Sequence, residues 1–271
     1  MRWRQSRKSS NVQDRRGMGM PLVAGGGIGA LVIALLVIFL GGDPSEITQA
    51  TRPAGPPSAE EEQLALMISH VLGDTEDVWN EQLPAQAGTP YREPSLVLFT
   101  GATESSCGVG QSAHGPFYCP LDENIYIDLS FFEDLSSRFG ASGDFAQAYV
   151  LAHEVGHHVQ TILGTSERVR NAQQRAGGTE ANQLSVAQEL QADCYAGIWA
   201  YHAQQSRQIL EAGDIEEALG AASAIGDDRI QKQTQGHITP DSFTHGSSAQ
   251  RVEWFRRGLS SGRMESCDTF R

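Results

Sequence analysis

Two histidines and a glutamate stand at a spacing that suits metal chemistry. His153-Glu154-Val155-Gly156-His157 is an HExxH pattern. On a helix, residues four positions apart lie one turn apart on the same face, so both imidazoles can reach one ion. Glu154 stands beside them and can take a proton from a water that the ion activates. The pattern predicts a hydrolytic metal site; the plainer interpretation is a pair of surface histidines.

A catalytic zinc site needs a third protein ligand and leaves a fourth position open. In Glu189-Leu190-Gln191-Ala192-Asp193, the two acids share one face of an expected helix. Glu189 can ligate the ion, and Asp193 can accept the outer N–H of a ligand histidine and fix its orientation. The alternative is a solvated acid pair. Small residues on this helix would let it pack closely on the first: Ala192, Ala196, Gly197 and Ala200.

These motifs carry a family resemblance. HEVGH followed by ELQAD resembles the gluzincin arrangement of thermolysin and of the heat-shock and prenyl-protein membrane peptidases. The stretches CGVGQSAHGPFYCPLDENIYIDLSFF, VLAHEVGHHVQ, ELQADCYAGIWA and DSFTHGSSAQRVEWFRRGL together are similar to the bacterial putative neutral zinc metallopeptidase family. The resemblance covers about residues 62–271, with the basic N-terminus and one membrane span. It implies a zincin-like fold that binds one Zn²⁺ ion through His153, His157 and Glu189, with Glu154 as catalytic acid/base.

His245 and Arg251 are further candidates for catalysis. The histidine precedes the arginine by six residues, which is similar to the His-Pro…Arg element of the prenyl-protein peptidases, with Gly246 in place of the proline. Either cation near the zinc would stabilise a developing oxyanion. The alternative is a helix-cap region in which Arg251 binds a structural acid such as Asp193 or Asp241.

The charges of the chain are divided unevenly. Its 271 residues include 20 Lys and Arg against 33 Asp and Glu, a net charge of −13. Residues 1–40 hold six basic groups and one acid, a charge of +5, which leaves −18 on residues 41–271. Such asymmetry predicts different surroundings for the two parts. The overall acidity argues against nucleic-acid binding, because a phosphate backbone needs a basic face.

Leu22–Leu40 is an uncharged run of 19 mostly apolar residues. As a helix it would span roughly 28 Å, close to the thickness of a bilayer core. The basic residues before it predict a single-pass helix in the cytoplasmic membrane, with the N-terminus inside and the domain outside. A cleaved signal peptide is the alternative, and it would export the same domain.

All four cysteines fall in the part of the chain expected outside: Cys107, Cys119, Cys194 and Cys267. An even number there predicts disulfides, and the sequence allows three pairings. A bond from Cys107 to Cys119 is favoured because these two enclose a short glycine-rich loop, which leaves Cys194 to pair with Cys267. Cysteine ligation of zinc is not expected, since there is no CxxC pair.

Hydrophobic periodicity predicts two strands followed by several helices. Strands are expected over residues 95–100 and 124–129, and helices over 62–83, 144–163, 185–205, 214–225 and from Ser247, where Ser247 and Gln250 fit a capping box. This order favours an α+β fold with a small sheet and a helical bundle that carries HExxH. Residues 124–129 are expected to form the edge strand that binds extended substrate, and His158 to point away from the metal.

The sequence therefore predicts four regions. They are a basic cytoplasmic tail over residues 1–20, a transmembrane anchor over 21–41, a linker rich in proline, glycine and acids over 42–62, and a metallopeptidase domain over 63–271. The expected function is hydrolysis of peptide bonds in a protein or peptide substrate. The alternatives are a non-catalytic, membrane-tethered zinc module, and hydrolysis of a non-peptide amide by the same zinc chemistry.

Overall fold

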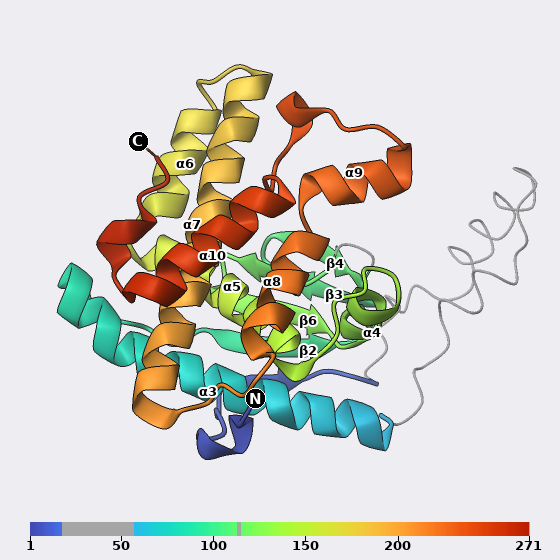
Figure 1. Ribbon diagram of the computed structural model, residues 1–271, viewed down its shortest axis with the longest axis vertical. Helices are drawn as coiled ribbons and strands as arrows, with labels where there is room; N and C mark the ends of the chain where they lie inside the picture. The colour runs from blue at the N-terminus through green and yellow to red at the C-terminus, as the bar shows by residue number, and fades with distance from the viewer. Residues whose placement is uncertain (18–56, 113–114, 271) are drawn as a thin grey trace, which may run out of the picture.

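The fold was analysed in a computed structural model, which describes residues 1–17, 57–112 and 115–270. It is α+β, as predicted, and Figure 1 shows the sheet beside a stack of helices. The strands are β1 (Val12–Asp14), β2 (Ser95–Phe99), β3 (Ala102–Ser105), β4 (Gly108–Gln111), β5 (Phe117–Cys119) and β6 (Asn124–Asp128). The longer helices are α3 (Ala59–Ala87), α5 (Asp144–Ile162), α7 (Gly178–Arg207) and α10 (Ser248–Ser261). The shorter ones are η1 (Trp3–Gln5), α4 (Ser130–Ser137), α6 (Thr165–Gln173), α8 (Asp214–Ala224), α9 (Asp227–Gln235), η3 (Pro240–Ser242) and η4 (Met264–Cys267).

The main sheet has the strand order β1-β2-β6-β5. β1, β2 and β6 run parallel, and β5 runs antiparallel to β6. Side chains alternate between the two faces of a strand. Leu96 and Leu98 of β2 therefore reach the main core, whereas Val97 and Phe99 pack in a small second cluster. β6 lies inside the sheet, so the prediction that residues 124–129 form the edge strand is wrong. The edge strands are β1 and β5, and β5 is the one beside β6.

Local sequence signals fix where two of the helices begin. Ser247 and Gln250 form the capping box that was predicted for α10, because each side chain accepts a hydrogen bond from the backbone N–H of the other residue. Ser58 and Glu61 form a second capping box at the start of α3. Residues that were assigned to the linker are thus helical from Ala59 onward.

Glycines bring α5, α7 and α10 into close contact. A Cβ on Gly156 would lie 2.9 Å from the carbonyl oxygen of Ala192, and one on Gly197 would lie 2.2 Å from that of Phe255. On the facing helix, a Cβ on Gly258 would lie 1.9 Å from the carbonyl oxygen of Cys194. These distances are too short for any side chain. The three helices that carry the candidate site residues are therefore held backbone to backbone.

Residues 1–17 pack on the domain, although the sequence suggested a separate basic tail. β1 extends the sheet beside β2, and Trp3 is buried in the main core. The amino group of Met1 lies 2.7 Å from Asp144 at the start of α5 and 3.4 Å from Asp214. In Figure 1 this segment runs in blue alongside α3. The structure thus makes the segment a part of the domain's sheet and core.

The predicted membrane anchor, residues 21–41, falls entirely outside the described residues. Within residues 1–17, 57–112 and 115–270, no helix has the length and apolar character that crossing a bilayer requires. The apolar run 22–40 is not among them, so the anchor stays a prediction.

Both predicted disulfides are present. Cys107 is bonded to Cys119 and Cys194 to Cys267, and the described part of the chain contains no free cysteine. The second bond fastens the C-terminal η4 to α7, one residue after Asp193. It therefore closes a long loop at the helix that carries two of the candidate site residues.

We expect the two disulfides to differ in their contribution to stability. They span 12 and 73 residues respectively, and loop-closure entropy grows with loop length. Replacing Cys194 and Cys267 by serine should lower the free energy of unfolding by about 1–2 kcal/mol more than replacing Cys107 and Cys119. Denaturant unfolding of the two double variants measures the difference. Equal losses would contradict the expectation.

Candidate functional site

A cavity of about 1150 Å³ lies where α5, α7 and β5 meet. His153, Glu154 and His157 of α5 line it, together with Glu189 of α7. One end of the cavity lies one turn beyond His157 and is polar. It is lined by Thr161, Ser166, Glu167, Arg170, Gln173, Ser185 and Gln188. The other end lies about one turn before His153 and is mainly apolar. Val150, Phe131, Phe139, Ile225 and Ile230 line it, and Asp134 and Arg138 of α4 line the cavity as well.

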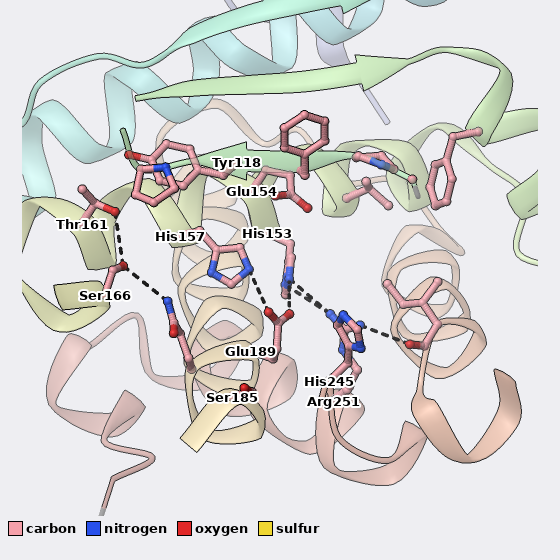
Figure 2. Close-up of a pocket in the computed structure, with 18 of the residues that line it drawn as sticks. Tyr118, His153, Glu154, His157, Thr161, Ser166, Ser185, Glu189, His245 and Arg251 are labelled. Carbon is pink, nitrogen blue, oxygen red and sulfur yellow. Dashed lines mark hydrogen bonds and ion pairs between the residues drawn. The ribbon is translucent and has the colours of Figure 1, made fainter. Parts of the chain in front are cut away.

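The structure brings His153, His157 and Glu189 together. Nε2 of His153 lies 3.0 Å from Oε2 of Glu189, and Nε2 of His157 lies 3.4 Å from Oε1. Figure 2 shows both imidazoles pointing at this carboxylate, with Glu154 on their other side, nearer Tyr118. The four-residue spacing therefore places the rings of His153 and His157 on one face of α5, as predicted. Glu189 of the neighbouring helix α7 faces both rings.

Each ring has its outer nitrogen occupied. Nδ1 of His153 lies 2.8 Å from Oδ1 of Asp193, as the sequence suggested. Nδ1 of His157 lies 2.9 Å from Oε1 of Gln160. Because a carboxylate or amide oxygen accepts the proton on Nδ1, Nε2 is the nitrogen of each ring that can offer a lone pair to a metal when it is not protonated. The sequence reasoning missed Gln160, although it lies three residues after His157 and so shares its helix face.

Three such donors fit a zinc ion. A tetrahedral ion with ligands at about 2.0–2.2 Å separates them by about 3.3–3.5 Å. In the structure the three donor atoms all lie within 4.8 Å of one another, and no other His, Cys, Asp or Glu of the described residues belongs to the group. Two imidazoles and one carboxylate are the ligand set of catalytic zinc sites with an open fourth position. A closed structural site would need a fourth protein ligand.

Asp193 is fully buried and binds two cations. Both its oxygens contact Arg251, at 2.8 Å from Nε and 2.9 Å from a terminal nitrogen, and the hydroxyl of Tyr149 donates to it as well. Burial alone would raise the pKa of Asp193, but Arg251 and His153 outweigh it and lower this pKa to about 2. Burial alone would lower the pKa of His153, but Asp193 and Glu189 raise it to about 9. Without metal, the His153 imidazole is therefore held as a cation.

Glu154 is buried at the cavity wall, with 7 % of its surface exposed. Burial raises its pKa above the ordinary range, although His157 and His153 oppose the shift. A carboxylate with a raised pKa holds a proton more firmly, which suits a group that takes a proton and later releases it.

His245 and Arg251 lie differently from one another. The side chain of His245 is half exposed in the cavity, and its Nδ1 lies 3.1 Å from Oδ1 of Asp227. The bond to Asp227 raises the pKa of His245. Arg251 is 2 % exposed and is bound to Asp193 behind His153. Binding to a structural acid was the alternative considered for this arginine, and the structure has that contact.

His158 ties α5 to the edge strand. It is fully buried, and its Nε2 lies 2.6 Å from the carbonyl oxygen of Arg92, which fixes the proton on that nitrogen. Its Nδ1 therefore accepts from the hydroxyl of Tyr118 on β5, at 3.0 Å. Burial lowers the pKa of His158, which keeps the ring neutral. The side chain points away from the candidate metal ligands, as expected, but it also positions β5 beside the cavity.

Comparison with known proteins agrees with the geometry. The sequence profile of the putative neutral zinc metallopeptidase family matches residues 1–270. The uncharacterized protein YpfJ of Escherichia coli K12 is 49% identical over 288 residues, covering 100% of this chain and 99% of YpfJ. The uncharacterized protein Rv2575 of Mycobacterium tuberculosis H37Rv is 46% identical over 203 residues, 71% of this chain and 66% of that protein. No solved structure matches. The resemblance that the motifs suggested is confirmed: the chain belongs to the putative neutral zinc metallopeptidase family.

Proposed function

We propose that the protein is a zinc-dependent endopeptidase that uses Glu154 as its general acid and base. The observation that carries the proposal is the convergence of two imidazole nitrogens and the Glu189 carboxylate at distances of 3.0 and 3.4 Å, with Glu154 buried beside them at the wall of a large cavity. A zinc ion held by His153, His157 and Glu189 supplies Lewis-acid chemistry, which acidifies a water and polarises a carbonyl.

The remaining chemistry belongs to the side chains. Glu154 takes a proton from the attacking water and delivers it to the leaving amine, a transfer that its raised pKa favours. His245 stands in the same cavity with a raised pKa, so that it presents positive charge where an oxyanion develops. Arg251 acts as a positioning residue, since it holds Asp193 and through it the ring of His153.

We further propose that substrate lies along β5 as an extended strand. β5 is the end strand of the main sheet, and its residues Phe117 and Tyr118 line the cavity. The outer side of an edge strand offers main-chain N–H and C=O groups to an added strand. An extended peptide placed there would run past Glu154 toward both ends of the cavity, which favours proteins or peptides over small amides.

The proposed place of action is outside the cytoplasm, in a membrane-attached protein. Two disulfides and the lack of free thiols among the described cysteines support an oxidising compartment. The run of 19 apolar residues over 22–40 supports attachment to the membrane.

Replacing Asp193 by asparagine should weaken zinc binding by about 10–100-fold, because the outer N–H of His153 loses its carboxylate acceptor. Competition with a chromogenic chelator measures the affinity. Asp134→Asn is the matched control, since Asp134 lies at the cavity in an exposed pair with Arg138 and touches no ligand. An unchanged zinc affinity for Asp193→Asn would show that this carboxylate does not orient the ligand.

Replacing Glu154 by glutamine should spare zinc binding and lower kcat for peptide cleavage by about 10²–10⁴-fold, because the amide cannot accept a proton. Turnover of a peptide library and metal content are measured on the same preparation. The control is Glu167→Gln, an exposed acid in the same cavity, which should keep most of the activity. Full proteolysis by Glu154→Gln would sink the mechanism. Bound zinc without turnover by the wild-type protein would favour a non-catalytic module.

His245 and Arg251 should separate by their kinetics. Removing a group that stabilises an oxyanion costs about 10²–10³-fold in kcat, so His245→Ala should lose turnover while zinc affinity stays unchanged. Arg251→Met should lose stability and zinc affinity together, because it leaves Asp193 buried without its partner. Activity and zinc titrations on both variants test this. A loss of zinc affinity in His245→Ala would reverse its assignment.

A further inference from the structure

We infer that residues 1–17 and the metallopeptidase domain occupy the same side of the membrane. A single crossing by the apolar run 22–40 would place them on opposite sides, since it stands between them in the sequence. Main-chain and side-chain contacts join residues 1–17 directly to the domain, so a bilayer cannot lie between the two parts.

Main-chain bonds hold the segment along most of its length. The N–H of Arg2 donates to the carbonyl oxygen of Ile209 at 2.8 Å, and that of Ser9 donates to the carbonyl oxygen of Ser69 at 3.0 Å. β1 then pairs with β2 over Val12–Asp14, with Val12 opposite Leu96. Removing β1 would leave β2, a five-residue apolar strand, as an open edge of the sheet.

Side chains of residues 1–17 also form hydrogen bonds and ion pairs with a buried acid of α3, Glu76. The hydroxyl of Ser9 and the amide of Asn11 donate to Oε1 of Glu76, at 2.6 and 2.9 Å, and Arg7 pairs with its other oxygen at 2.6 Å. Glu76 is fully buried. An ionised carboxylate without partners in such a place would be strongly destabilising. The acid therefore depends on the segment for its burial.

Gly73 marks the contact from the side of α3. A Cβ at this position would lie 2.3 Å from the carbonyl oxygen of Arg7. Glycine is the poorest ordinary residue in a helix interior, so its presence in the middle of α3 disfavours the helix itself. The close approach of residues 7–9 to α3 explains why glycine occupies position 73.

The same contacts explain why the positive charges mislead a topology prediction. The positive-inside rule applies to basic groups that flank a span and stay on one side of the membrane. Here Arg7 pairs with Glu76 and Asp77 of the domain, and Arg16 pairs with Asp14 and with Glu62 of α3. These charges are matched by acids within the fold.

Labelling of single introduced cysteines tests directly on which side of the membrane each part lies. Ser10→Cys and Glu180→Cys introduce thiols at exposed positions of the segment and of the domain, while all four native cysteines are paired. In spheroplasts that express the full chain, a membrane-impermeant maleimide should label both thiols to the same extent before permeabilisation. Labelling of Glu180→Cys before and Ser10→Cys only after permeabilisation would overturn the inference. Labelling of both only after permeabilisation would support the shared compartment but contradict an extracytoplasmic site.

Gly73→Ala tests the docking itself. The methyl group should displace residues 7–9, so that trypsin cleaves after Arg4, Arg7 and Lys8 at least about tenfold faster in the membrane-extracted full chain. Gly220→Ala is the matched control, because Gly220 lies in helix α8 with open space where its Cβ would be. That control should keep the wild-type cleavage rate. Equal protection of the segment in Gly73→Ala and the wild type would contradict docking.

Discussion

The structure of the site depends on the buried carboxylate of Asp193. It lies on α7 and contacts His153 of α5 and Arg251 of α10, so that one side chain joins three helices. A buried charge costs several kcal/mol unless it is paired and hydrogen-bonded, and breaking such a pair typically costs about 3–5 kcal/mol. Arg251 meets this need with two bonds to the carboxylate, which leaves Asp193 anionic and able to fix the His153 ring. Stability of the bundle and orientation of the ligand therefore have one origin.

Glycines make this arrangement possible. Asp193 reaches both neighbours only because Gly156 lets α5 approach α7, and because Gly197 and Gly258 let α7 approach α10. Two of these three glycines lie in or beside the motifs themselves, since Gly156 is within HExxH and Gly197 follows Asp193 by four residues. The backbone contacts and the ligand set are thus encoded in the same short stretches of sequence. The disulfide from Cys194 to Cys267 adds a covalent tie at the same level of α7.

The sequence anticipated the features that follow from helical spacing. The sequence revealed two pairs of residues that share a helix face, because four residues make about one turn: His153 with His157, and Glu189 with Asp193. It also revealed the capping box of α10, because the two residues of that box are only three positions apart. Features that depend on contacts distant in sequence were missed. β5 has only three residues, too few for alternation to identify it, so β6 was assigned as the edge strand. The docking of residues 1–17 was hidden because their arginines and serines have their partners about 45 to 70 positions away, on α3.

The two edge strands of the main sheet, β1 and β5, differ in their surroundings. β1 belongs to the docked residues 1–17, and β5 borders the candidate site. β1 covers the apolar strand β2 and is itself short and polar, followed by Arg15 and Arg16, which discourages further strand addition at that edge. β5 at the opposite edge is held beside the cavity by the bond between Tyr118 and His158. At the β1 edge, the protein's own N-terminal residues therefore already pair with β2. The edge that remains is β5, next to Glu154, which is where the proposed substrate strand would add.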